Sequence, residues 1–136
     1  MILQPDIMES LFTQAEYEAP IEACGYLAGT DGQITRHFPL TNIDGKEDHF
    51  SFDPQEQFAT LKAARQEGLS IIGMYHSHPA SPARPSPEDV RLAYDPTIVY
   101  IIISLMNDTR TVRGFYIRKG EVVEEPLTIG ENTNDQ

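Results

Sequence analysis

Two short segments of this chain carry the side chains best suited to chemistry. His76 and His78 are two positions apart, so in an extended segment both imidazoles project from the same side. Asp89 follows on a second segment that begins at Ser86, and its carboxylate could complete a set of three ligands. Two imidazoles and one carboxylate, with a fourth position left for water, are the ligand set of a catalytic zinc site.

Each segment also has a purely structural interpretation. A His-x-His pair at the end of a strand is often a polar pair at the mouth of a loop. Ser86 can cap a helix whose first position is Pro87, and Asp89 at the third position resembles the acidic partner of a capping box. Capping and metal binding are compatible, because a capped first turn would fix Asp89 while Ser86 faces the same opening as the histidines.

A third acidic position lies far upstream. Glu22 immediately precedes the apolar stretch 23–29, which ends in glycine and predicts a strand, so this carboxylate sits at the edge of a buried element. Taken alone, Glu22 is equally well read as a solvated acid at a junction between a helix and a strand.

Together these positions resemble the JAMM metalloproteases, the MPN-plus group of the JAB-domain proteins. The motif of that family is an upstream Glu, then His-Ser/Thr-His-Pro, then seven residues and Ser-x-x-Asp. Glu22, His76-Ser77-His78-Pro79, Ser86 and Asp89 match every position and spacing. The resemblance covers roughly residues 1 to 125. Within the family, the chain is most similar to the small stand-alone prokaryotic members.

The chemistry expected of such a site can be argued from the residue types. One Zn²⁺ held by His76, His78 and Asp89 would lower the pKa of its water from about 15.7 to about 7. Glu22 is then suited to act as the general base, and Ser86 could donate its hydroxyl to the oxyanion, a contribution of about 3 kcal/mol. Iron or manganese could occupy the same ligand set. The resemblance places the same roles on the same positions.

The resemblance also implies a substrate class. JAMM enzymes cut the amide bond after the C-terminal Gly-Gly of ubiquitin-like proteins, whose extended tail binds as an added strand. The small prokaryotic members release an amino acid such as cysteine, or a short extension, from a ubiquitin-like sulfur-carrier protein. The segment Phe50–Phe52 is the candidate sheet edge for that tail.

Three alternatives remain open at this point. The enzyme could instead be an isopeptidase that removes ubiquitin-like modifiers from lysine conjugates. It could be a non-catalytic MPN scaffold, although the complete motif argues against that. Third, it could be a related JAB-domain protein of the kind associated with DNA repair. The net charge of -11 argues against this alternative, because it disfavours a nucleic-acid partner.

Composition is consistent with a cytoplasmic domain. With 136 residues, 40% of them hydrophobic, the chain has the length of one domain. No signal segment or membrane-spanning run is expected, and the single cysteine, Cys24, is expected to be a buried free thiol. We expect the metalloprotease domain to span 1–128 and a polar, disordered tail to span 129–136. The oligomeric state stays open.

The pattern of apolar and turn residues predicts a single-domain α/β fold. The expected elements are helices at 6–18, 54–67 and 87–93 and strands at 24–28, 34–40, 50–52, 71–75, 98–104, 111–117 and 121–125. Phe58, Leu61 and Ala64 are predicted to form the inner face of the second helix. Ser77 should point away from the two histidines, and His49 should be exposed or bonded locally. The resemblance implies the same architecture, an α-β-α sandwich with a mixed, curved central sheet of the cytidine-deaminase-like type.

Overall fold

Within residues 1–30 and 32–130, which the computed structural model describes, eight strands form one sheet in the order β7-β6-β5-β4-β2-β3-β1-β8. The strands are β1 (Ile2–Leu3), β2 (Cys24–Thr30), β3 (Gln33–Leu40), β4 (Ser70–His78), β5 (Val99–Ser104), β6 (Thr111–Arg118), β7 (Glu121–Glu125) and β8 (Thr128–Ile129). The sheet is mixed, because β1 runs parallel to both β3 and β8 and β4 runs parallel to β5, while the other pairs are antiparallel.

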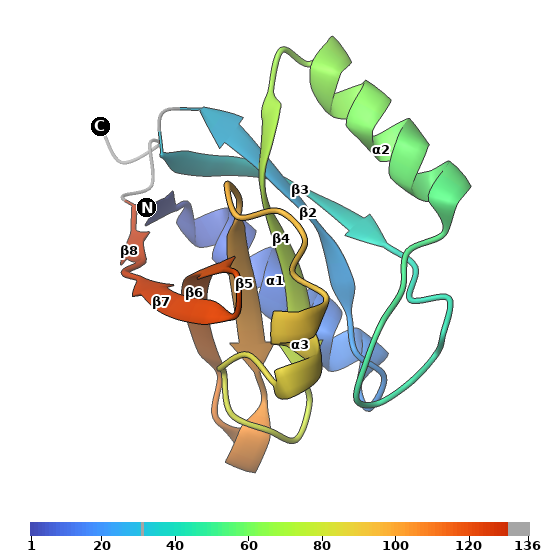
Figure 1. The fold of residues 1–136 in the computed structure, drawn as a ribbon, viewed down its shortest axis with the longest axis vertical. Helices are drawn as coiled ribbons and strands as arrows, with labels where there is room; N and C mark the ends of the chain where they lie inside the picture. The colour runs from blue at the N-terminus through green and yellow to red at the C-terminus, as the bar shows by residue number, and fades with distance from the viewer. Residues whose placement is uncertain (31, 131–136) are drawn as a thin grey trace.

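Helices cover both faces of this sheet (Figure 1). Helix α1 (Pro5–Glu18) packs its buried stripe, which includes Leu11 and Phe12, against side chains of the central strands such as Ile101 and Ile103. Helix α2 (Pro54–Gln66) and the short helix α3 (Pro87–Arg91) lie on the opposite face. The structure confirms the predicted α-β-α sandwich.

The sheet curls strongly around α1. Strand β7 ends at Glu125 and β8 begins at Thr128, although the two strands are the opposite edges of the sheet. Three residue steps span at most about 11 Å, so the two edges must come close to each other. The predicted curvature of the mixed sheet is therefore confirmed, and its concave face encloses the core around α1.

Most predicted elements lie within a few residues of their observed bounds, but the strand predicted at 50–52 is wrong. This segment makes one isolated bridge, between Asn42 and Phe52, instead of a ladder. The reason is that the Asn42 side chain accepts the Ser51 N–H, so a side chain replaces the neighbouring strand as its partner. The two-residue strands β1 and β8 were too short for the apolar pattern to indicate.

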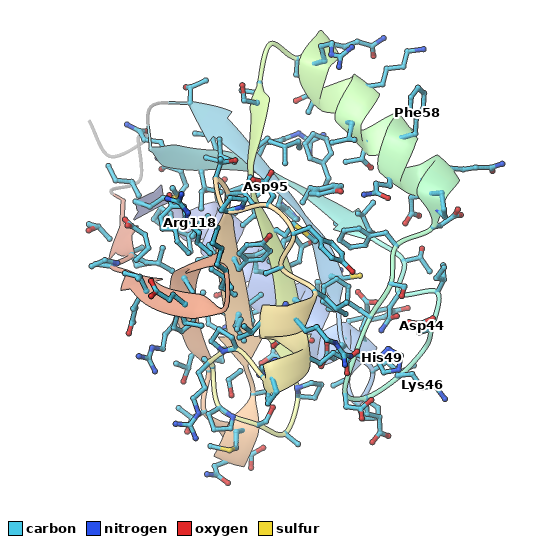
Figure 2. The ribbon with its side chains drawn as sticks, viewed as in Figure 1. Asp44, Lys46, His49, Phe58, Asp95 and Arg118 are labelled. Carbon is cyan, nitrogen blue, oxygen red and sulfur yellow. The ribbon has the colours of Figure 1, made fainter. Side chains whose placement is uncertain are left out.

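The predicted inner face of α2 is also wrong for two of its three residues. Thr60 and Ala64 are buried, whereas Leu61 is 39% exposed and Phe58 is 71% exposed. Phe58 projects away from the sheet (Figure 2). At about 100° per residue, Phe58 lies about 200° around the helix from Thr60, so the two cannot share a face. The helix packs against the sheet through small side chains, which allow a close approach.

The end of the described chain adds to the sheet. The N–H of Thr128 donates to the carbonyl of Met1 over 2.9 Å, and Gly130 donates to Leu3 over the same distance. Ile129 and Gly130, which were expected in the polar tail, therefore continue the edge of the sheet beside β1. The rest of the expected tail, 131–136, lies outside the described residues. No helix among those described is long and apolar enough to cross a membrane.

Candidate metal centre

The site lies where β2 and β4 run side by side at one end of the sheet. Cys24 pairs with His76 in the antiparallel register, and the Ser77 N–H donates to the Ala23 carbonyl over 2.9 Å. Ala23 therefore lies opposite Ser77, and the next pair in the same register is Glu22 and His78. Directly opposed residues project to the same face of a sheet, so the strand pairing brings the Glu22 carboxyl and both imidazoles to the α2/α3 side.

Three ligand atoms converge at this point. His76 Nε2 and His78 Nε2 lie 3.1 Å apart, and each lies 3.1 Å from Asp89 Oδ2. Ligands bound to zinc at 2.0–2.1 Å in a tetrahedron are separated by about 3.3 Å, so the three atoms already have nearly the spacing of one face of that tetrahedron. Among the described residues, this is the cluster of His, Cys, Asp and Glu side chains that could hold a metal ion.

Asp89 is positioned by the first turn of α3. Ser86 Oγ accepts the N–H of Asp89 over 3.0 Å, and Asp89 Oδ2 accepts the N–H of Ser86 over 2.9 Å, which completes a capping box. Pro87 occupies the first helical position, where no donor is needed. Since Ser86 Oγ accepts from the backbone, its own hydroxyl hydrogen stays free to donate. The capping predicted for this turn is confirmed, and the same turn places Asp89 Oδ2 beside the two imidazoles.

Contacts outside the cluster fix the orientation of both imidazoles. His78 Nδ1 lies 2.8 Å from the carbonyl of Pro82, so Nδ1 carries a hydrogen, and a metal would bind at Nε2 in place of the proton shared with Asp89. The His76 ring stacks on Phe50, with ring centroids 4.9 Å apart and an interplanar angle of 30°. These contacts preset both imidazoles, so binding a metal requires little rearrangement.

Charges in the cluster are coupled. Burial alone would raise the pKa of Asp89, but hydrogen bonds from His76 and His78 outweigh it and hold the pKa far below its ordinary value. Burial lowers the pKa of His78, and the bonds to Asp89 and Pro82 more than reverse this, so that pKa is raised. The carboxylate is therefore ionised and ready to bind a cation.

Glu22 is an acid held in an apolar environment. Its side chain is 3% exposed, and among the described residues Oε1 has no hydrogen-bond partner. Burial raises the pKa of Glu22 from 4.5 to about 8, and the charges of His78 and Asp89 also act on it. A buried carboxyl with a free oxygen, next to a second carboxylate, leaves the site short of positive charge. A divalent cation would supply that charge, so the donor set fits a metal.

Ser77 lies on the other side of β4 from the two histidines, as predicted. It is fully buried, and its Oγ accepts the N–H of Ala23 over 2.7 Å. Together with the backbone bond between the same two residues, this ties the strand that carries the histidines to the residue after Glu22. Cys24 is a buried free thiol, which confirms that prediction, and burial raises its pKa to about 12.

A cavity of about 650 Å³ opens beside the cluster, and His76 and Asp89 form part of its wall. Its floor is an apolar strip of the sheet between α2 and α3, and aromatic and aliphatic side chains line its sides. The floor includes Tyr26, Ile71, Met74, Tyr100, Ile102 and Ile117, and the walls include Phe50, Phe52, Leu61, Leu92 and Tyr94. An extended peptide could lie in this cleft and reach the ligand cluster.

Two site residues were not foreseen from the sequence. Phe50 was expected at a sheet edge, but its ring contacts a ligand histidine, and no sequence signal distinguishes these roles. No role was expected of Asn42, yet it is 8% exposed and donates to the carbonyl of Glu22 over 3.1 Å. His49 bonds locally to Asp44 over 3.1 Å, as predicted, and it also lines the cleft.

Comparison with known proteins gives consistent matches. Residues 4–116 match the family described as prokaryotic homologs of the JAB domain. The CysO-cysteine peptidase of Mycobacterium tuberculosis is 33% identical over 96% of this chain and 92% of its own. A probable TtuB-protein conjugate cleaving protease of Thermus thermophilus is 37% identical over 78% of this chain and 68% of its own. A solution structure from Desulfitobacterium hafniense superposes with a TM-score of 0.88 at 43% identity, covering 97% of this chain and 94% of that one.

Proposed function

Because the chain belongs to the prokaryotic JAB-domain family, we propose that it is a zinc-dependent peptidase acting on a ubiquitin-like sulfur carrier. It hydrolyses the amide bond after the C-terminal Gly-Gly and releases an amino acid such as cysteine, or a short extension. The observation that carries this proposal is the convergence of three ligand atoms within 3.1 Å of one another, beside a buried carboxyl with a free oxygen.

His76, His78 and Asp89 would hold one Zn²⁺ through their Nε2, Nε2 and Oδ2 atoms. When bound, zinc supplies a Lewis acid that polarises a carbonyl and lowers the pKa of water. The fit rests on the ligand spacing and on the shortage of positive charge around two buried acids. Imidazole and carboxylate donors of this kind also bind iron and manganese, so the metal in the cell is part of what must be measured.

Glu22 serves as the general base. Its Oε1 is free to accept a proton from the attacking water, and the same carboxyl then donates that proton to the departing amine. A group whose pKa lies near the working pH is suited to accept and return a proton in one reaction cycle, and burial raises the pKa of Glu22 toward that range. The strand register keeps this carboxyl opposite His78.

Ser86 serves as an oxyanion donor. Its oxygen is held by the N–H of Asp89, so the hydroxyl hydrogen can be directed to the developing negative charge on the carbonyl oxygen. The same serine caps the helix that carries Asp89. Donor and ligand therefore belong to one helical turn and keep a constant distance from each other.

The apolar cleft suits an extended C-terminal tail. A tail ending in Gly-Gly has no side chains at its last two positions, so it can lie close to the ligand cluster, while preceding side chains occupy the floor between α2 and α3. The relative from M. tuberculosis, which matches across nearly the whole chain, is named for a carrier joined to cysteine. This supports a single amino acid as the leaving group.

A second candidate is cleavage of protein conjugates, in which the leaving group is a lysine amine. The relative from T. thermophilus, named for TtuB-protein conjugates, favours it. The same residues would perform both reactions, because each breaks an amide bond after the carrier's tail. The complete ligand set argues against a non-catalytic scaffold.

Intact-mass spectrometry tests the proposal directly. The zinc-loaded protein is incubated with a panel of ubiquitin-like sulfur carriers extended by one cysteine beyond Gly-Gly, and with the same carriers joined to a lysine side chain. We expect the wild-type protein to remove the cysteine and the Glu22→Gln variant not to remove it. Both proteins should bind one zinc and unfold cooperatively on heating. Cleavage by Glu22→Gln at the wild-type rate, or a wild-type protein that takes up zinc but cleaves neither substrate, would contradict it.

A further inference from the structure

The side-chain amide of Asn42 is fully hydrogen-bonded inside the protein. Nδ2 donates to the carbonyls of Glu22 and His49, each over 3.1 Å. Oδ1 accepts the N–H of Asp44 over 3.1 Å and that of Ser51 over 3.3 Å. The partners fix the orientation of the amide, since a flipped amide would face two donors with its NH₂ and two carbonyls with its oxygen.

The segment that Asn42 organises, Ile43–Ser51, is called the active-site loop below, because it touches both halves of the site. Figure 2 shows Asp44, Lys46 and His49 on this loop. The carbonyl of Lys46 accepts the N–H of Glu22 over 3.0 Å. At the other end of the loop, Phe50 stacks on the ring of His76.

Glu22 depends on this loop for its backbone hydrogen bonds. It lies two residues ahead of β2, outside the strand ladder, which begins at Cys24. Its N–H bonds to Lys46 and its carbonyl bonds to Asn42, so both of its backbone groups are held by the segment that follows β3. The bonds to β4 end at Ala23 and set the face of the sheet to which Glu22 projects, whereas the bonds to the loop hold the backbone of Glu22 itself.

We propose that Asn42 is a positioning residue that couples the active-site loop to the backbone of Glu22. The amide sets the distance between the general base and the two ligand histidines, and it keeps the loop that walls the cleft in register with that base. This role rests on the proposed function of Glu22 as the base. A shift of about 1 Å in a reacting group can slow catalysis by a factor of about 100, so a small loosening has a large effect.

Two variants and a matched control test the role in the zinc-loaded protein. Asn42→Asp keeps the shape of the side chain but replaces both donor hydrogens, and Asn42→Ala removes the amide. Gln14→Ala is the control, because Gln14 is also an amide hub, bonded to Tyr75, Cys24 and Glu18, but it does not contact the active-site loop. For each we measure kcat, KM, the number of zinc ions bound and the thermal midpoint.

Both Asn42 variants should lose about 10- to 100-fold in kcat, with KM changed less than about 3-fold and one zinc still bound. The Gln14→Ala control should keep kcat within about 3-fold of the wild-type value, even if its thermal midpoint falls as far as that of the Asn42 variants. A loss of kcat in the control equal to that in the Asn42 variants would overturn the proposal, because the effect would then follow from general destabilisation. Wild-type kcat in both Asn42 variants would also overturn it.

Amide hydrogen exchange gives a second test that needs no substrate. In the metal-free wild type, the N–H groups of Glu22, Asp44 and Ser51 should be protected, and all three should exchange at least about 10-fold faster in Asn42→Ala. The Ser77 N–H, bonded to Ala23, should keep its protection. If only Asp44 and Ser51 lose protection, the loop is not coupled to Glu22 and the proposal fails. This outcome is independent of whether the wild-type protein proves to be a peptidase.

Discussion

At the scale of single residues, the proposed chemistry depends on a carboxyl in an unfavourable environment. Glu22 is almost completely buried, and one of its oxygens has no partner among the described residues. Such a group lowers the stability of the metal-free protein whenever it is ionised. The site therefore retains a destabilising residue, which is expected where a reacting group must keep an oxygen free.

This cost predicts how stability depends on pH. In the metal-free protein the pKa of Glu22 is raised from 4.5 to about 8, so between these values the folded state holds a proton that the unfolded state has lost. Stability contributed at this position is thus present below about pH 4.5 and lost as the pH rises through 8. The magnitude is a few kcal/mol, at about 1.4 kcal/mol for each tenfold change in proton affinity.

Denaturant unfolding of the metal-free wild type and Glu22→Gln at several pH values measures this effect. The variant should gain stability relative to the wild type as the pH rises from 5 to 9, because Gln cannot ionise. The comparison reduces the contribution of His78, because the bonds to Asp89 and Pro82 that raise its pKa are present in both proteins, while the smaller effect of the Glu22 charge on that pKa is lost in the variant. A constant difference between the two proteins over that range would contradict the expected burial of the charge.

At the scale of elements, α3 shows how one short helix performs two tasks. Its capping box holds Asp89 in place, and the same turn presents the Ser86 hydroxyl. Five residues form too few backbone bonds to stabilise a helix alone, so the cap and the ligand contacts contribute a large share of its stability.

We expect Ser86→Ala to lower zinc affinity by about 10-fold, because the Asp89 N–H loses its bond to the Ser86 hydroxyl and the turn that carries the carboxylate is held less firmly. Cleavage should fall further than binding, since the hydroxyl is also the proposed oxyanion donor. Ser86→Thr keeps the cap and should retain zinc affinity. Competition with a chromogenic chelator measures the affinities, and unchanged affinity in Ser86→Ala would show that the cap does not position the ligand.

Helix α2 gives a prediction about packing. Ala64 is 1% exposed at the contact with the sheet, so Ala64→Leu should destabilise the protein by about 1–3 kcal/mol. Phe58 is 71% exposed, and Phe58→Ala should change stability by less than about 0.5 kcal/mol. Urea midpoints of the two variants measure this directly. The reverse order would mean that the helix packs through the face that includes Phe58.

At the scale of the whole molecule, the ligands join parts of the fold that are distant in the chain. His76 and His78 belong to a central strand, and Asp89 belongs to a helix that otherwise contacts the sheet through a few apolar side chains. A bound metal would therefore link α3 to the sheet, and the energy of binding would add to the stability of the fold.

Zinc at about 100 times its dissociation constant should stabilise the protein by about 2.7 kcal/mol and raise the thermal midpoint by several degrees. Chelation should reverse the change. Asp89→Asn serves as the control and should show a much smaller shift with zinc, because it lacks the ionised ligand. Scanning calorimetry with and without zinc measures both, and equal shifts in the two proteins would mean that zinc binds elsewhere.

The sequence by itself determined the order of the longer helices and strands and the ligand candidates. Strand and helix patterns follow from local spacing of apolar residues, and the His-x-His and Ser-x-x-Asp segments carry their chemistry in short stretches of the chain. Their convergence could be inferred because the motif includes both segments and the distant Glu22. The capping box at Ser86 was also readable, since a cap depends on residues within one turn.

Only the tertiary structure decided what surrounds these residues. The inward face of α2, the stacking of Phe50 on His76 and the four hydrogen bonds of Asn42 all join segments that are distant in sequence, and no local pattern encodes which segments meet. Ala64 packs in the cluster that includes Tyr26 and Phe38, while the larger Phe58 is exposed, an arrangement that hydrophobicity alone does not indicate. Glu22 acquires its raised pKa for the same reason, because burial is a property of the assembled fold.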